Sequence, residues 1–387
     1  MLLSRFSLLI VATLIAISAN GQDINPEGIR LTSPLDYQVF QRQNRVSGSI
    51  RISGRVAEKG TLQCQIIGTP LEGKLDTNWR TIEVDAKTRD FKSEIAIPAG
   101  GWYRLNLRVT DDGKTVATHA IDHVGVGEVF IVAGQSNSTN YGSEKQRPAS
   151  DLVVSFDGEK WAPANDPQPG THDKSSGGSF IPALGDALAA KYKVPIAIAS
   201  TGQGATSVRQ WLMKGEKIEV HPTLDAFVKT TGPNQWECTG ALYDHLMKRI
   251  GALGPHGFRA ILWHQGESDA GQAREGYPAE RQITGKQYRD LLEHLIRATQ
   301  KDAGWKIPWF VALATYHSEK DPADEEFRAA QKSLAEEGIA QPGPDADSLR
   351  KEYRAGVHFN AKGLKAHGEL WAAKVENYLD RVFADEK

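Results

Sequence analysis

One serine of this chain stands where a nucleophile would be well placed. The apolar run VFIVA (129–133) leads directly into GQSN (134–137), which puts Ser136 at the carboxyl end of a predicted buried strand. Gly134 permits a tight backbone turn at that point. A serine in such a position is more often a turn residue or a helix cap. Ser136 therefore needs partner groups before it counts as a nucleophile.

Three further segments supply such groups. The Gly-rich segment STGQGAT (200–206) exposes backbone amides that could bind an oxyanion. The segment WHQGESD (263–269) holds an imidazole, a carboxamide and carboxylates within a short stretch. The segment GVHFN (356–360) carries His358, whose imidazole could accept the Ser136 proton. The four segments together favour acyl-transfer chemistry.

From residue 127 onward, strand and helix patterns alternate around these segments. Short, continuous apolar runs predict buried strands at 129–133, 195–199, 260–263 and 309–314. Between and after these runs, helical stretches are predicted at 182–192, 241–250, 284–299, 324–337 and 361–383. This alternation predicts a parallel, doubly wound sheet, and so a three-layer α/β/α domain of flavodoxin-like build. In such sheets, ligands bind beyond the carboxyl ends of the strands, where Ser136 is expected.

The N-terminal part has a different pattern. Runs at 46–56, 62–67, 91–97 and 103–109 alternate apolar and polar residues, as half-buried antiparallel strands do, and DDG (111–113) predicts a turn. We expect a small β-sandwich domain over residues 22–125 and the α/β domain over 126–387. Residues 143–178, rich in Gly, Pro, Ser and Asp, should be mostly loop. The sequence leaves three roles open for the β-rich domain: it could support the crevice, bind glycan or mediate oligomer contacts.

The composition argues against some classes of partner and site. The chain of 387 residues has a formal net charge of -2, and its charged residues, 24% of the total, mix both signs. Nucleic acid is therefore a poor candidate partner. The two cysteines, Cys64 and Cys238, lie far apart and are expected to be free buried thiols. No clustered Cys/His spacing supports a structural zinc site.

Residues 1–21 have the pattern of a secretory signal peptide. Arg5 precedes the apolar stretch 8–17, and small residues at 19–21 offer a cleavage site. The stretch is shorter than the roughly 20 residues that span a bilayer, which favours cleavage over an uncleaved anchor. No later segment predicts a membrane span. We expect a mature chain that begins near Gln22 and is secreted or periplasmic.

In their order along the chain, the four segments resemble the signature blocks of the SGNH hydrolases. The resemblance is to the branch that holds sialate O-acetylesterases and acetylxylan esterases, with its GQSN block, a GGT block followed by Trp, a WHQGESD block and a final HF block. It extends from about residue 127 to the C-terminus and leaves the β-rich part outside. GQSN alone is a weak signal, but GQSN followed by WHQGESD is a strong one.

The resemblance implies a role for each matching position. Ser136 would be the nucleophile and His358 the general base. The backbone amides of Ser136 and Gly204 would form the oxyanion hole, Gly204 being chosen by its position before Trp211. In this branch Gln265 would replace the asparagine of the wider superfamily as a third oxyanion donor. No cofactor is needed.

The sequence departs from the family pattern in two places. Ala205 replaces the second glycine of GGT, which matters little if only the Gly204 amide is used. Ala355 stands where the triad aspartate is usually found, shortly before the histidine. Asp345, Asp347 and Glu267 are candidates for a substitute acid. A backbone carbonyl could also hold the imidazole, or the enzyme could use a dyad.

Other groups near these segments have plainer alternatives. His264, Glu267 and Asp269 have the composition of a metal cluster, but their spacing matches no standard ligand motif. We expect Glu267 and Asp269 to brace the loop that bears Gln265.

Tryptophans and one loop could contribute to substrate binding. Among the Trp residues, Trp161, Trp211 and Trp236 could include a platform for a sugar ring, although most tryptophans are core residues. His172 and Asp173 lie in the predicted long loop and either touch ligand or are solvated.

The sequence therefore predicts a secreted serine esterase that removes acetyl groups from a carbohydrate through an acetyl-serine intermediate. One alternative is an SGNH esterase that acts on other acyl esters. The other, motivated by Ala355, is a carbohydrate-binding protein on an esterase scaffold that has lost activity. The acetylated sugar and the oligomeric state stay open at this point.

Overall fold

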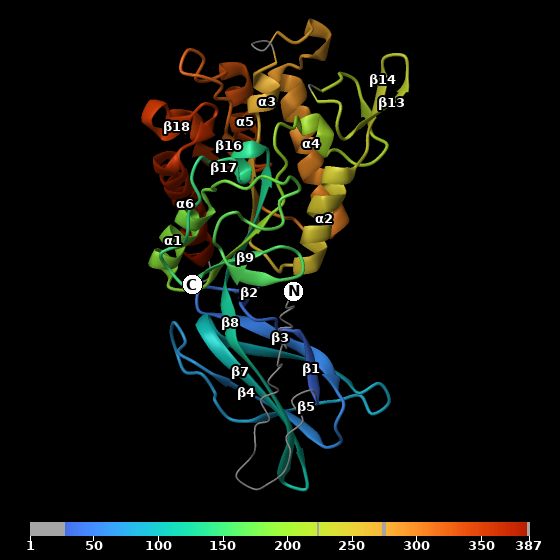
Figure 1. Cartoon of the computed structure of the whole chain (residues 1–387), viewed down its shortest axis with the longest axis vertical. Helices are drawn as coiled ribbons and strands as arrows, with labels where there is room; N and C mark the ends of the chain where they lie inside the picture. Colours follow the sequence, from blue (N-terminus) through green and yellow to red (C-terminus); the bar gives the residue numbers. More distant parts are fainter. Residues whose placement is uncertain (1–27, 223, 273–275, 385–387) are drawn as a thin grey trace, which may run out of the picture.

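The computed structural model describes residues 28–222, 224–272 and 276–384. These form an elongated molecule, with a β-rich part at one end and an α/β part at the other (Figure 1). The expected signal peptide, residues 1–21, lies outside the described residues. No helix among the described residues is both long and apolar enough to cross a membrane.

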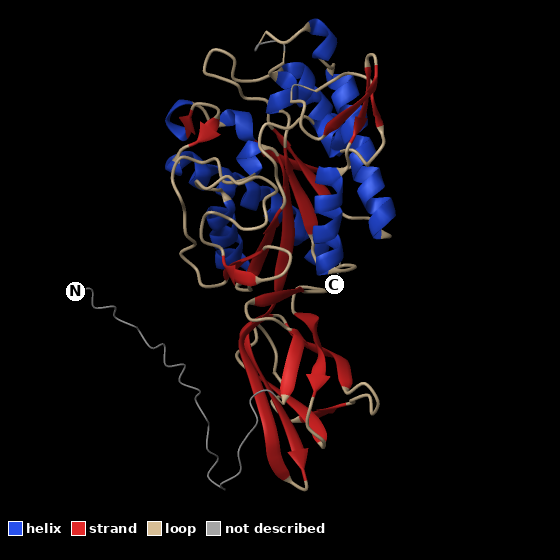
Figure 2. Ribbon diagram, turned by 45° about the vertical axis from the view of Figure 1, so that its right-hand side comes forward, coloured by secondary structure: helices blue, strands red, loops and turns tan. Residues whose placement is uncertain are grey.

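The β-rich part contains two sheets that share one core (Figure 2). Ile50 and Ile52 of one sheet and Leu105 and Leu107 of the other are fully or almost fully buried in it. The first sheet has the order β1 (Ile29–Ser33), β3 (Ser47–Val56), β6 (Asp90–Pro98). The second contains β2 (Gln38–Gln41), β4 (Thr61–Ile67), β5 (Arg80–Ile82), β7 (Gly100–Asp111) and β8 (Lys114–Gly134).

Strand β8 belongs to both parts of the molecule. It is 21 residues long. Its residues 114–127 pair with β7 and β2, and the remaining residues pair with strands of the α/β part, beginning at Glu128. The expected domain boundary at residues 125/126 therefore falls inside a continuous strand, with no linker between the two parts.

The α/β part is built on the second half of β8. Its strands follow the order β10-β9-β11-β8-β15-β16-β17, and every neighbouring pair is parallel except β10 with β9. The strands are β9 (Val153–Phe156), β10 (Trp161–Pro163), β11 (Ile196–Ser200), β15 (Ala260–His264), β16 (Trp309–Leu313) and β17 (Gln341–Asp345). The prediction of an α/β fold is confirmed.

Helices cover both faces of this sheet, which explains why its strands read as continuous apolar runs. Phe130 and Val132 of β8 belong to the core formed with α1 and α6, whereas Val129, Ile131 and Ala133 belong to the core formed with α2, α4 and α5. The helices are α1 (Ile181–Tyr192), α2 (Ala241–Leu253), α3 (Glu267–Ala270), α4 (Gly285–Ala303), α5 (Glu325–Glu336) and α6 (Ala361–Ala384).

Local sequence signals set several of the helix ends. Thr284 and Gln287 form a reciprocal capping box at the start of α4, and Gly304 ends that helix in the left-handed conformation. Asp324 accepts hydrogen bonds from the first backbone N–H groups of α5.

Three features differ from the sequence-based expectation. Strand β17 has the sequence QPGPD and shows no apolar run, because it lies at the sheet edge, where proline is tolerated. The segment 143–178 is mostly loop as expected, but it also contributes β9 and β10 to the sheet. A small three-stranded sheet, β12 (Lys217–Ile218), β14 (Gln235–Cys238) and β13 (Val228–Gly232), lies between β11 and α2 in the sequence.

Candidate active site

Ser136 lies at the carboxyl end of β8, on the short 3-10 turn η1 (Ser136–Ser138). The turn depends on Gly134, which has a φ of +127°, and a Cβ there would lie 2.0 Å from the carbonyl oxygen of His264. Only glycine fits a backbone so close to the neighbouring strand. Ser136 is 7% exposed, so its surroundings exclude most water.

The hairpin of β18 (Arg354–Ala355) and β19 (His358–Phe359) carries His358 to the same end of the sheet. The side-chain amide of Asn137 donates a hydrogen bond to the carbonyl oxygen of Val357 at 3.2 Å, which ties this hairpin to η1. Among the described residues, no hydrogen bond joins the Ser136 hydroxyl to the His358 ring. The structure thus brings the two segments together without the direct contact that proton transfer requires.

The surroundings of His358 keep its imidazole neutral. Burial lowers its pKa below the ordinary value, and the Arg354 charge also lowers it, while the Glu267 carboxylate opposes both by raising it. Tyr141 stacks on the imidazole with a centroid distance of 5.0 Å and an angle of 29°. A neutral imidazole is the form that can accept a proton.

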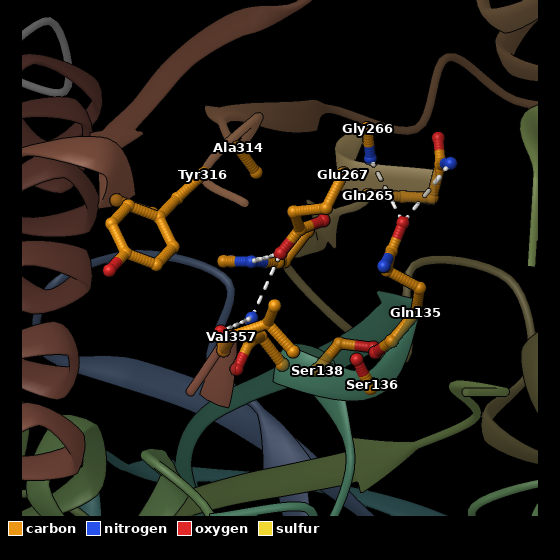
Figure 3. A network of polar contacts seen from close by, with 12 residues as sticks. Gln135, Ser136, Ser138, Gln265, Gly266, Glu267, Ala314, Tyr316 and Val357 are labelled. Atoms are coloured by element: carbon orange, nitrogen blue, oxygen red, sulfur yellow. Dashed lines mark hydrogen bonds and ion pairs between the residues drawn. The ribbon is translucent and has the colours of Figure 1, made fainter. Parts of the chain in front are cut away.

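Glu267 lies deep in the site, at the start of α3 (Figure 3). Its Oε1 accepts hydrogen bonds from Asn137 Nδ2 and His264 Nε2, both at 2.9 Å. Its Oε2 is buried and has no hydrogen-bond partner among the described residues. Although burial raises the pKa of Glu267, the charge of His264 and these hydrogen bonds hold it below its ordinary value. Glu267 is therefore a buried carboxylate with one unused oxygen.

The other two candidate acids, Asp345 and Asp347, form hydrogen bonds and ion pairs with Arg328. Asp347 accepts hydrogen bonds from the Thr315 hydroxyl at 2.6 Å and from Arg328 Nη1 at 2.9 Å, as well as from backbone amides. Asp345 forms a two-point ion pair with the same guanidinium, at 2.8 Å on each side. Both carboxylates bind Arg328, and none of these contacts involves His358.

Gln265 is fully buried, and its side-chain amide donates to several acceptors. Its Nε2 lies 2.7 Å from Asp269 Oδ2, 3.0 Å from the carbonyl oxygen of Thr206 and 3.3 Å from Gln135 Oε1. Asp269 in turn accepts from the Ser207 hydroxyl and the Val208 backbone amide. Gln265 and Asp269 thus connect the loop after β15 to the loop after β11. To serve as an oxyanion donor, Gln265 would have to exchange one of these acceptors for the substrate.

Gly204 lies on the loop after β11, and its backbone N–H donates to Asp173 Oδ2 at 2.7 Å. A Cβ at Gly204 would lie 2.8 Å from the ring of Tyr141, so a larger residue would collide with that side chain. The next residue, Ala205, has a φ of +57°, a conformation that glycine adopts more easily. His172 lies on the same side, with its ring Nδ1 2.7 Å from Gln203 Oε1.

Three important residues of the site carried no signal that sequence reasoning used. Asn137 bridges Glu267 and the His358 hairpin. Arg354 stacks on Phe359 at 3.8 Å and donates to backbone carbonyls of its own loop, including that of Val357 at 2.9 Å. Tyr141 covers one face of the imidazole. Asn137 could have been found, because it belongs to the GQSN motif, but nothing in the sequence singles out Arg354 or Tyr141.

The remaining expectations concern His264 and the tryptophans. His264 contacts Glu267 on one side and His367 on the other, at 3.1 Å, whereas Asp269 faces the Ser207 hydroxyl. Trp211 is fully buried, Trp161 is 8% exposed, and Trp236 is half-buried, so Trp211 offers no open face to a sugar.

Comparisons with known proteins identify one matching family profile and several similar solved structures. The sequence profile of the family described as carbohydrate esterase, sialic acid-specific acetylesterase, matches residues 126–377. A carbohydrate acetylesterase from Xanthomonas citri is 18% identical, with a TM-score of 0.54 over 90% of this chain and 75% of that one, which shows a shared fold. A protein from Arabidopsis thaliana is 18% identical, with a TM-score of 0.47 over 65% of this chain and 98% of that one. No curated protein sequence matches the chain.

Proposed function

The chain belongs to the carbohydrate esterase family of sialic acid-specific acetylesterases, and from that premise we propose that it removes O-acetyl groups from an acetylated sugar with Ser136 as nucleophile. Membership makes the protein an esterase. The observation that supports Ser136 and His358 as its reacting groups is their location, because η1 and the β19 hairpin are joined by Asn137 at the carboxyl edge of the sheet.

The proposed reaction has two steps. In the first, the Ser136 oxygen attacks the acetyl carbonyl carbon while His358 takes the hydroxyl proton, and the sugar oxygen then leaves with that proton. In the second, water attacks the acetyl-serine ester while His358 takes a proton from it, the bond between the acyl carbon and the Ser136 oxygen breaks, and that oxygen leaves with the proton as acetate is released. The low pKa of His358 suits this role, since the ring is neutral before each attack.

Backbone amides would stabilise the oxyanion that forms in each step. The Ser136 N–H lies at the N-terminal end of η1, where backbone N–H groups have no partner inside the helix. The Gly204 N–H belongs to the facing loop. Gln265 would be a third donor only after release from one of its present acceptors.

Glu267 is the acid that we propose for the position that Ala355 leaves empty. Its unused Oε2 and its influence on the pKa of His358 both support this role. A carboxylate near the imidazole stabilises the cation that forms when the ring accepts a proton. Asp345 and Asp347 are both already bound to Arg328.

We also propose that the enzyme is exported and acts on an acetylated glycan outside the cytoplasm. The signal-peptide pattern of residues 1–21 supports export. The family description supports a carbohydrate substrate.

Acetate release by the wild type and by Ser136→Ala tests the proposal. We expect the wild type to release acetate from acetylated xylan or an O-acetylated sialic acid, and to cleave 4-nitrophenyl acetate faster than the butyrate. Ser136→Ala should reduce these rates about a thousandfold or more. Ser138→Ala, in the same 3-10 turn, should keep most of the activity.

Two results would contradict the proposal in different ways. Equal background rates for the wild type and Ser136→Ala would exclude Ser136 as the nucleophile. A preference for long acyl chains over acetyl would instead exclude an acetylesterase while leaving the serine mechanism intact.

A further inference from the structure

The backbone N–H of Gly204, which the proposed function assigns to the oxyanion, already donates a hydrogen bond to the carboxylate of Asp173. Gly204 donates to Asp173 Oδ2 at 2.7 Å, the short distance typical of a charge-assisted hydrogen bond. An oxyanion in the transition state and a carboxylate oxygen are both anionic acceptors, and they compete for the same donor. One N–H cannot serve both at full strength.

Asp173 is held in this place by its own loop. Its Oδ1 accepts from the backbone N–H of Ser175 at 3.1 Å and from the Ser175 hydroxyl. The loop itself is tethered to the Gly204 loop independently of Asp173, because the His172 backbone N–H donates to the carbonyl oxygen of Gly202 at 2.9 Å. The Asp173 side chain can therefore leave Gly204 without the loop leaving the site.

Tyr141 stands beside this contact. It lies against Gly204 on one side and His358 on the other, it is 41% exposed, and burial together with the charge of Asp173 raises its pKa. Among the described residues, Val46 and Ile67 are the other large apolar side chains with comparable exposure, and both lie in the β-rich part. A ligand that approaches Ser136 past Tyr141 thus also meets Asp173.

We propose that Asp173 is a specificity-determining residue, whose carboxylate yields the Gly204 N–H to the substrate and takes a hydroxyl of the sugar in exchange. This inference rests on the proposed function. An acetylated sugar with a free hydroxyl next to its ester replaces the hydrogen bond that Asp173 loses. An acetate ester without such a hydroxyl leaves Oδ2 of the displaced carboxylate without a hydrogen bond, which is unfavourable in a half-buried site.

The experiment compares three substrates with the full chain. One is a methyl xyloside monoacetate with free neighbouring hydroxyls, the second is the same compound with those hydroxyls methylated, and the third is 4-nitrophenyl acetate. Asp173→Asn and Asp173→Ala should raise kcat/KM for the second and third about tenfold, the equivalent of one charge-assisted hydrogen bond. The same variants should leave kcat/KM for the first nearly unchanged, because its hydroxyl only replaces the hydrogen bond that Asp173 loses, so that the preference for free hydroxyls disappears.

Two controls separate this role from a structural one. Lys174→Ala changes the charge of the same loop at an exposed position and should leave the substrate preference unchanged. Ser175→Ala removes a bond that holds Asp173 and should change the preference in the same direction as Asp173→Ala, but less. The rate at which a neutral phosphonate ester modifies Ser136 should also rise in Asp173→Ala, because its P–O group uses the freed N–H.

The outcomes are distinct. If the Asp173 variants slow all three substrates equally, or leave the phosphonate rate unchanged, the residue does not control access to the Gly204 amide and the inference is wrong, while the esterase assignment stands. If the wild type cleaves none of the three esters, the proposed function fails and this inference fails with it.

Discussion

The Asn137 side chain donates a hydrogen bond to the Val357 carbonyl oxygen at 3.2 Å, so the residue after Ser136 holds the residue before His358. The same amide nitrogen donates to Glu267 Oε1 at 2.9 Å. One side chain therefore positions the proposed nucleophile, base and acid relative to one another. Since misplacement of about 1 Å can reduce turnover a hundredfold, this contact should matter for rate more than for folding.

Asn137→Ala is expected to lower kcat about ten- to a hundredfold with little change in KM, because the hairpin of His358 loses its tie to η1. Steady-state kinetics on 4-nitrophenyl acetate measures both constants. The melting temperature serves as the control. A variant that melts like the wild type and also turns over like it would show that Asn137 does not position the base.

Glu267→Gln should change the pH profile as well as the rate. The carboxylate raises the pKa of His358, so its removal lets that pKa fall further, and the acid limb of kcat/KM should move to lower pH. The plateau should fall about a hundred- to ten-thousandfold, because the imidazolium loses its counter-charge. In the wild type, the same limb should lie below the ordinary histidine value of 6.5.

Asp347→Asn is the matched control for this change. Its carboxylate bonds Thr315 and Arg328, so its loss should lower the free energy of unfolding by about 1–3 kcal/mol without moving the pH profile. A shift of the profile in Asp347→Asn, with none in Glu267→Gln, would assign the acid to Asp347 instead.

Gly204→Ala should impair catalysis, because the methyl group that it adds would collide with Tyr141. The new Cβ would lie 2.8 Å from Tyr141, which forces either the loop or the Tyr141 ring to move. We expect kcat to fall about a hundredfold, comparable to the loss of one oxyanion donor. Gly204→Ala combined with Tyr141→Ala should recover part of this loss. A double variant as slow as Gly204→Ala alone would place the damage in the backbone rather than in the collision.

Glu128→Gln tests how the two parts of the molecule are held together. Glu128 is fully buried between Arg42, at 2.7 Å, and Arg259, at 2.8 Å. Its replacement leaves buried guanidinium charges without their partner and should lower the free energy of unfolding by about 3–5 kcal/mol. Asp122→Asn, which removes an exposed partner of Arg104, should change it by less than about 1 kcal/mol.

The same carboxylate predicts a pH dependence of stability. Burial raises the pKa of Glu128, but the two arginines more than offset this and hold it below the ordinary value of 4.5. Its contribution is therefore present above that value and is lost as the pH falls through the lower folded pKa. Denaturant unfolding at a series of pH values should show this loss in the wild type and a smaller one in Glu128→Gln.

The sequence was informative wherever local pattern decides the structure. The helix of 361–383 was predicted nearly to its ends, because its apolar residues repeat with the helical period. The apolar run at 129–133 marked only the last part of β8, which begins at Lys114. The DDG turn at 111–113 joins β7 and β8 as expected. Strand β17 was missed because its prolines and glycine carry no such pattern.

The choice among the candidate acids could not be made from the sequence. Asp345, Asp347 and Glu267 are chemically equivalent on paper, and only tertiary contacts assign the first two to Arg328 and leave Glu267 with a free oxygen. The contact of Asp173 with Gly204 is of the same kind, since it joins two loops that no motif relates.

Strand β8 runs from the β-rich part into the α/β part without a break, and Ser136 follows two residues after its last residue, Gly134. The β-rich end is therefore not a tethered module that can swing freely. Any molecule bound at that end would lie at a fixed distance from the hydroxyl of Ser136.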